Sequence, residues 1–228
     1  MKKLSIVFIL FLFVRHLDAQ DSLMVQTDSV NVSGEINVTL TDSSTVVTEV
    51  SEVPDSLQQV LLPSHYLFTQ RWLWGENGLM RKKGKYQLTL DGREHEMEIR
   101  AKMNQIHRIA GYVSLAGMIG SGITGQMTSN GNDQAKGAHQ IFTGLTNLSY
   151  FGSLALAVFS PPPMRDRETG FTNVNIHKAL SIVHVASMLT TNILSGMLEQ
   201  NPSLVPYHRA AAITAFSTLF LATVVINL

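Results

Sequence analysis

Four histidines stand near the start of four apolar segments, and each is followed by a polar, mostly basic residue. The pairs are His107-Arg108, His139-Gln140, His177-Lys178 and His208-Arg209. A six-coordinate b-type haem needs two neutral imidazoles, one on each face of the iron. The positions 107 and 177 are 70 residues apart, and 139 and 208 are 69 apart. Alternate segments therefore form two matched pairs, which predicts two haems.

The apolar segments that carry these histidines are about as long as a membrane span. They cover residues 105–127, 138–160, 175–197 and 206–227, and roughly 20 residues cross the hydrocarbon. Consecutive spans run in opposite directions, so His107 and His177 are predicted near one membrane face and His139 and His208 near the other. The predicted fold is an all-α membrane protein, an antiparallel four-helix transmembrane bundle in residues 104–228.

A fifth histidine leaves one ligand open. His184 follows His177 by seven residues, so both point to nearly the same side of the helix, about 10 Å apart along its axis. His177 lies about as far from the start of its span as His107 does, so it is favoured as the partner of His107. His184 is then an alternative ligand, a polar residue near the macrocycle or a packing residue. Gly111, four residues after His107, would leave room for a flat macrocycle. The other glycines of this segment suit close helix packing.

Three cations next to the histidines have two interpretations. Arg108, Lys178 and Arg209 can extend to the membrane surface and bind haem propionates, or can simply anchor helix ends in the interface.

The composition excludes several classes of protein. The chain has 228 residues, no cysteine and a formal net charge of zero. Disulfides, thiolate metal sites, iron–sulfur clusters and covalently attached c-type haem are therefore excluded, and haem would be held without covalent bonds. The charge balance gives no case for nucleic acid. No P-loop, dinucleotide fingerprint or hydrolase triad is present, so no catalytic residue is predicted.

The first 103 residues divide into three parts. Residues 1–20 have a basic start and an apolar core typical of a secretory signal peptide. Residues 21–60 contain seven acids and no Lys or Arg, which predicts a flexible acidic segment. In residues 61–103, aromatic and basic side chains alternate, as at a membrane–water interface; they are Tyr66, Phe68, Trp72 and Trp74 with Arg71, Arg81, Lys82, Lys83 and Lys85. A solvated basic connector is the alternative.

Two local predictions concern the last part of that stretch. Residues 86–90 have the composition of a short strand that ends at Asp91-Gly92. Residues 93–103 are predicted to be a charged helical extension of the first span.

Two rules disagree on orientation. The signal peptide would export residues 21–103 and leave the C-terminus outside the cytoplasm as well. The positive-inside rule favours the reverse, because more Lys and Arg lie on the N-terminal side of the bundle. Long exported segments translocate largely regardless of charge, so the signal decides. We predict a multi-pass protein of the bacterial inner membrane, with both the N-terminal segment and the C-terminus extracytoplasmic.

The four helix openings resemble the cytochrome b561 family. The carrying motifs are His107-Arg-Ile-Ala-Gly111, His139-Gln-Ile-Phe, His177-Lys-Ala-Leu and His208-Arg-Ala-Ala, within residues 104–228. The resemblance implies that His107 and His177 hold one b-type haem and His139 and His208 the other. The chain departs from the family in having four spans where eukaryotic members have six. Phe142, Ser181 and Ala211 or their neighbours replace glycines usual after the ligands.

Three functions follow in order of preference. The first is transmembrane electron transfer by a di-haem b561-like protein, an oxidoreductase only in that sense. Its donor would be a cytoplasmic-side reductant or a membrane quinol, and its acceptor extracytoplasmic. The second is a haem-free membrane interaction protein whose basic and aromatic segment binds a partner or anionic lipid. The third, histidine-based transport of a transition metal, lacks the ligands of a tetrahedral site.

Overall fold

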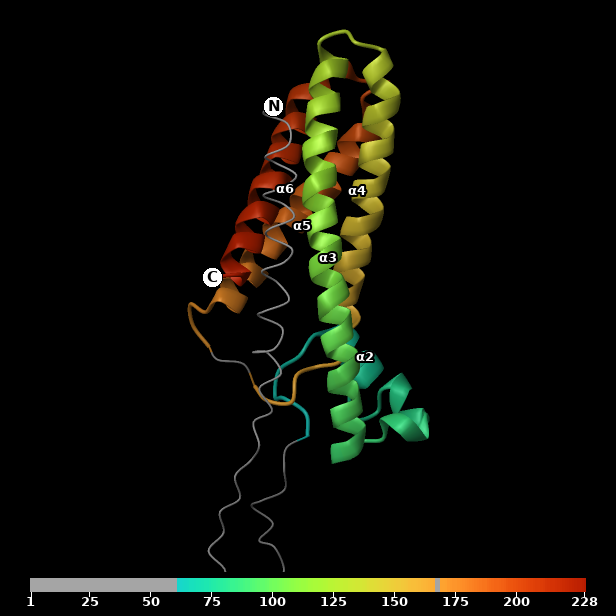
Figure 1. Ribbon diagram of the computed structural model, residues 1–228, viewed down its shortest axis with the longest axis vertical. Coiled ribbons are helices and arrows are strands. Elements are labelled where there is room, and N and C mark those ends of the chain that lie inside the picture. The colour runs from blue at the N-terminus through green and yellow to red at the C-terminus, as the bar shows by residue number, and fades with distance from the viewer. Residues whose placement is uncertain (1–60, 167–168) are drawn as a thin grey trace, which may run out of the picture. The chain divides into compact units, whose positions relative to one another are not determined.

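The computed structural model describes residues 61–166 and 169–228, all within one unit of the chain, residues 54–228. Every regular element in the described residues is a helix (Figure 1). The elements are α2 (Phe68–Trp74), η2 (Leu79–Lys82), η3 (Gly84–Tyr86), α3 (Leu90–Ser129), α4 (Gln134–Phe159), α5 (Asn173–Met197), η4 (Pro202–Leu204) and α6 (Val205–Ile226). The predicted signal peptide and acidic segment lie outside the described residues.

Three of the predicted spans are confirmed as helices long and apolar enough to cross a membrane. They are α4, α5 and the continuous segment Pro202–Ile226, which joins η4 to α6. Helix α3 is longer, at 40 residues, or about 60 Å at 1.5 Å per residue. The first half of α3 is charged, and its second half is rich in glycine and serine, which lowers the mean hydropathy of the helix. For this reason α3 is not among the three helices that are apolar enough to span a membrane.

The helix ends follow local chemistry, with one correction. The predicted strand at residues 86–90 is wrong, because the Thr89 side chain caps α3 by accepting from the Gly92 N–H at 3.2 Å. Asp91 and Gly92 thus lie in the first helical turn, and residues 93–103 continue the helix as predicted. Thr172 caps α5 in the same way, accepting from the Asn175 N–H at 3.2 Å.

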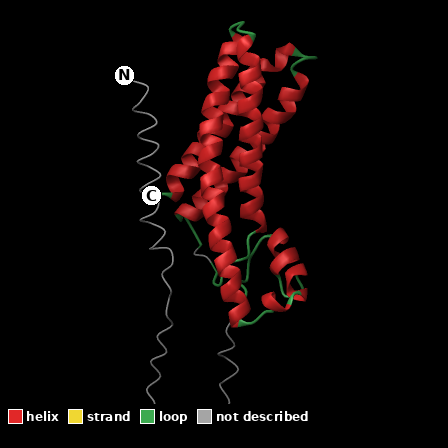
Figure 2. Ribbon diagram, turned by 45° about the vertical axis from the view of Figure 1, so that its right-hand side comes forward, coloured by secondary structure: helices red, strands yellow, loops and turns green. Residues whose placement is uncertain are grey.

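The four long helices are arranged as two close hairpins. Helix α3 packs along α4, and α5 packs along α6 (Figure 1). Figure 2 shows the long helices side by side from a second direction. Glycines permit the first contact, as predicted. A Cβ on Gly120 would lie 2.5 Å from the Phe142 ring, and one on Gly117 would overlap Thr146. No Cα of α4 lies within 8 Å of a Cα of α5, so the two hairpins keep their backbones apart on that side.

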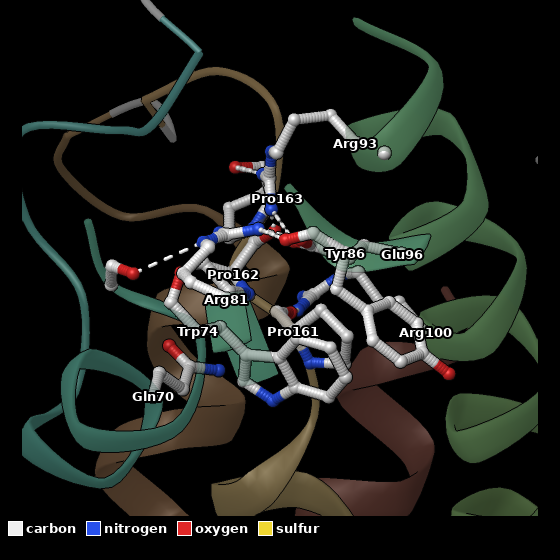
Figure 3. A network of polar contacts seen from close by, with 12 residues as sticks. Gln70, Trp74, Arg81, Tyr86, Arg93, Glu96, Arg100, Pro161, Pro162 and Pro163 are labelled. Atoms are coloured by element: carbon white, nitrogen blue, oxygen red, sulfur yellow. Dashed lines mark hydrogen bonds and ion pairs between the residues drawn. The ribbon is translucent and has the colours of Figure 1, made fainter. Parts of the chain in front are cut away.

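The carboxyl end of α4 is covered by side chains from α2 and α3 (Figure 3). Three prolines follow this helix and bring no N–H groups, so its last carbonyls have no backbone donors. Side chains replace them: Thr69 donates to Val158 O (2.5 Å), Trp74 to Phe159 O (2.9 Å), Gln70 to Ser160 O (3.0 Å), Arg100 to Pro161 O, and Arg93 to Pro162 O (2.9 Å) and Pro163 O (3.0 Å). The guanidinium charges also suit the negative end of a helix dipole.

A buried triad of charged side chains, Arg81, Arg93 and Glu96, joins η2 to the start of α3. The Glu96 carboxylate accepts from Arg81 through one oxygen and from Arg93 through the other. Arg81 also donates to the backbone oxygens of Trp74, Gly75 and Tyr86. Arg93 and Glu96 are fully buried. Burial lowers the pKa of Arg93, and the charge of Glu96 opposes that shift. Arg81 is therefore paired and largely buried, and it does not lie in the solvated or interfacial position that the sequence suggested.

The triad predicts a large effect from neutralising one carboxylate. Glu96→Gln leaves two buried guanidinium groups without a counter-charge, and we expect it to destabilise the α2–α3 junction by about 3 kcal/mol or more. Glu94→Gln, an exposed neighbour on the same helix, is the matched control and should change stability by less than about 0.5 kcal/mol. Thermal unfolding followed by tryptophan emission measures both, since Trp72 and Trp74 lie in α2. Equal midpoints for the two variants would contradict this role for Glu96.

Candidate functional site

All four predicted ligand histidines make the same hydrogen bond. In each, Nδ1 lies beside a backbone oxygen of the other helix in its hairpin: His107 with Ser153 (2.9 Å), His139 with Ser121 (2.9 Å), His177 with Ala222 (2.9 Å) and His208 with Thr191 (3.1 Å). A carbonyl oxygen can only accept, so Nδ1 carries the proton in each ring. The other nitrogen, Nε2, then has the lone pair. This is the arrangement that orients metal-ligating imidazoles.

The structure brings His107 and His177 together across the two hairpins. Their ring centroids are 6.4 Å apart and their planes are nearly perpendicular, at 86°. Two imidazoles that bind one metal from opposite sides, each through a bond of about 2 Å, have ring centres roughly 6 Å apart. The spacing of this pair therefore fits axial ligation of a single iron.

The second predicted pair lies on the other helix of each hairpin, α4 and α6, near the opposite end of the hairpins. His139 is near the start of α4 and His208 near the start of α6. Beside them, the Ser121 hydroxyl is buried and has no hydrogen-bond partner among the described residues. Such orphaned groups are uncommon, and this one is consistent with a ligand group next to His139.

His184 occupies a different environment from the other four. Its Nδ1 is 2.6 Å from the Tyr150 hydroxyl, and both side chains are buried. The Nδ1 atoms of the other four histidines lie beside backbone carbonyls, whereas Nδ1 of His184 lies beside a side-chain hydroxyl. The contact ties α5 to α4, whose backbones do not approach each other. This geometry favours His177 over His184 as the partner of His107.

A second polar bridge lies next to the first. Asn147 on α4 and Asn192 on α5 exchange two hydrogen bonds, of 2.8 and 3.1 Å, through their amides. Asn192 directly follows Thr191, whose carbonyl accepts from His208, so on α5 the amide pair lies close to the His208 level. Tyr150 and His184 lie nearer the middle of the hairpins, and the two polar bridges together span the gap between α4 and α5.

The small residues near the histidines separate into two groups. A Cβ added at Gly111 or Gly144 would meet nothing within 4 Å, so there is open space beside the residues that follow His107 and His139. A Cβ at Gly125 would instead lie 2.9 Å from Cε1 of His139. Gly125 therefore presses against an imidazole, whereas Gly111 leaves the room that a flat macrocycle would need.

The three predicted propionate partners lie beside the histidines in the chain, with different surroundings. Arg108 is half-buried, whereas Lys178 and Arg209 are exposed. Arg209 donates to the Ser129 hydroxyl at the end of α3, so it links the two hairpins near the His139/His208 level. This contact is compatible with either interpretation of the cations.

The donor set fits a haem better than a bare metal ion. The described part of the chain contains no group of three or more His, Cys, Asp or Glu side chains able to hold a metal ion. A haem supplies four equatorial nitrogens itself, so two imidazoles complete its iron. Facing His107 and His177, oriented through Nδ1, meet that requirement.

The sequence predicted the histidines but not their hydrogen-bond acceptors. All four rings use backbone oxygens of the neighbouring helix as acceptors. For His107 the Ser153 hydroxyl, 2.8 Å away, is an additional partner. No local signal marks a carbonyl 46 residues away in the chain.

Comparison with known proteins adds no assignment: no protein-family model, no curated protein and no solved structure matches this chain. The resemblance to cytochrome b561 thus remains a prediction from the histidine motifs.

The contact of Gly125 with His139 predicts a specific sensitivity. Gly125→Ala would push against the imidazole and weaken its bond to Ser121 O, and overpacking of this kind costs about 1–3 kcal/mol. Gly122→Ala, three residues away in the same helix, meets nothing within 4 Å and should stabilise the helix by up to about 1 kcal/mol. Thermal unfolding of the two variants in one detergent checks the opposite signs. A Gly125→Ala protein as stable as Gly122→Ala would contradict the packing described here.

Proposed function

We propose that this protein is a di-haem b-type membrane cytochrome that transfers electrons across the bilayer. The observation that carries the proposal is the shared hydrogen bond: four histidines on four helices each donate Nδ1–H to a backbone carbonyl. Any imidazole N–H in apolar surroundings needs an acceptor, but the repetition of one contact on four helices, with matched spacings in the two hairpins, supports a shared role for the four rings. The 6.4 Å spacing of the His107 and His177 rings supports the same conclusion.

The residues divide into two ligand sets under this proposal. His107 and His177 would hold one haem, and His139 and His208 the other. A bound haem supplies an iron that exchanges one electron without acid–base or nucleophilic chemistry. The chain orients the imidazoles through Ser153, Ser121, Ala222 and Thr191, and it surrounds them with apolar helices that exclude water. Arg108, Lys178 and Arg209 are proposed to bind the propionates at the membrane surfaces.

The proposal includes α3 as a fourth span. Its second half packs against α4 over residues 117–125, and α4 is long and apolar enough to cross a membrane. Because α3 packs closely along a helix that can span the membrane, we propose that α3 spans it as well. Its own glycine-rich sequence is less apolar than that of α4. An antiparallel four-helix bundle results, with His107 and His177 toward one face. We propose that this face is extracytoplasmic in a bacterial inner membrane, as the predicted signal peptide requires.

The pairing of the histidines can be tested by haem content. We expect two haems per chain in the full-length protein and one in His139→Ala or in His208→Ala. The double variant His139→Ala/His208→Ala should still hold one, since both residues serve the same haem. The double variant His107→Ala/His139→Ala should hold none. Haem per chain is measured by pyridine haemochrome after purification from haem-supplemented cells.

The double variants distinguish this pairing from other arrangements. One haem left in His107→Ala/His139→Ala would contradict it, because those residues would then share a site. His95→Ala is the control for histidine loss, since His95 lies outside the apolar part of α3 and stacks on Tyr86. It should keep both haems.

The choice between His177 and His184 is tested separately. His184→Phe should keep two haems, because its Nδ1 bonds to Tyr150 and not to a helix carbonyl. His177→Phe should keep one. Low-temperature spectra of the reduced proteins show which band is lost. A His184→Phe protein that loses one haem, beside a His177→Phe protein that keeps two, would assign the axial ligand to His184.

A further inference from the structure

Helix α2 has two chemically different faces. Gln70 and Trp74 are buried, with 6% and 5% exposure, and donate to the end of α4. Phe68 and Trp72 are exposed, at 81% and 54%. The exposed pair is four residues apart, so both rings lie on one side of the helix. Helix α2 thus buries a polar side chain, Gln70, and exposes two aromatic rings. A surface of this kind suits contact with an apolar or interfacial medium better than contact with water.

The position of α2 is fixed by the helix that it covers. Its buried face caps carbonyls at the carboxyl end of α4 (Figure 3), and α4 is long and apolar enough to cross a membrane. Helix α2 therefore lies at the level where α4 leaves the hydrocarbon. Tryptophan and other amphipathic aromatics concentrate at that depth, with the ring in the acyl boundary and the polar edge among headgroups.

Cations are next to this aromatic face. Arg81 binds the backbone oxygens of Trp74 and Gly75, so η2 folds back onto the carboxyl end of α2. The exposed lysines Lys82, Lys83 and Lys85 follow it. Residues 77–90 contain these lysines and Arg81 but no acid. Arg81 is largely buried and shares the Glu96 carboxylate with Arg93, so the lysines carry the exposed positive charge of this stretch.

We propose that residues 67–85 form a membrane collar, in which Phe68 and Trp72 insert at the bilayer interface and Lys82, Lys83 and Lys85 bind anionic phospholipid headgroups. The occupant of this surface is the leaflet that α4 exits. Clustered lysines beside a membrane-spanning helix attract anionic lipid electrostatically, and aromatic insertion holds them at headgroup level. The collar does not depend on haem, and it holds the α2–α3 junction on the membrane by a contact separate from the bundle.

The two tryptophans of the chain allow a direct test, since one is exposed and the other is buried. The full-length protein is reconstituted in nanodiscs that contain lipids brominated near the glycerol end of the acyl chain. We expect the emission of the wild-type protein to be quenched. Trp72→Phe, which leaves only the buried Trp74, should remove most of that quenching.

Headgroup selectivity is measured in the same experiment. At equal mole fraction, brominated phosphatidylglycerol should quench Trp72 at least about twofold more than brominated phosphatidylcholine, as expected for several lysines near the surface. Lys82→Gln/Lys83→Gln/Lys85→Gln should bring the ratio to about one and high salt should lower it. Lys136→Gln, at the opposite end of α4, should leave it unchanged. Emission of Trp72 that no brominated lipid quenches, or equal quenching by the two headgroups in the wild type, would overturn the proposal.

Discussion

The hydrogen bond from a histidine Nδ1–H to a carbonyl of the neighbouring helix is the interaction on which the rest of this structure depends. It acts on the ring and on the helices together. It fixes the tautomer, which leaves the lone pair on Nε2, and it sets the register of each hairpin at both of its ends. In α3 and α4 the two bonds run in opposite directions, from His107 to Ser153 and from His139 to Ser121. Apolar surroundings make such bonds costly to break.

The same geometry occurs in both hairpins. The bonded residues are 46 and 18 apart in the first hairpin and 45 and 17 apart in the second. Each hairpin therefore presents one oriented imidazole near each end, and the imidazoles of His107 and His177 meet across the two hairpins. The gap between them is spanned by side chains, Tyr150 with His184 and Asn147 with Asn192, because the backbones of α4 and α5 stay apart. Imidazoles at two levels of the hairpins suit two cofactors in series.

Much of this could be predicted from the sequence, for identifiable reasons. Helix positions follow from hydropathy and from breakers such as Pro161 and Pro202, which act locally. The histidines stand out because their spacing repeats. The burial of Arg93 and Glu96 could not be predicted, since it depends on Pro162 and Pro163 oxygens about 70 residues away. The strand expected at residues 86–90 failed for a local reason: Thr89 caps α3, and Leu90 is already the first residue of that helix.

The visible spectrum of the purified full-length protein tests the central claim most directly. Oxidised and dithionite-reduced spectra, with haem quantified per chain, should show two b-type haems whose reduced bands are sharp, as expected for two imidazole ligands on each iron. A colourless protein, purified from cells with ample haem, would contradict the account. The oriented histidines would then need another explanation.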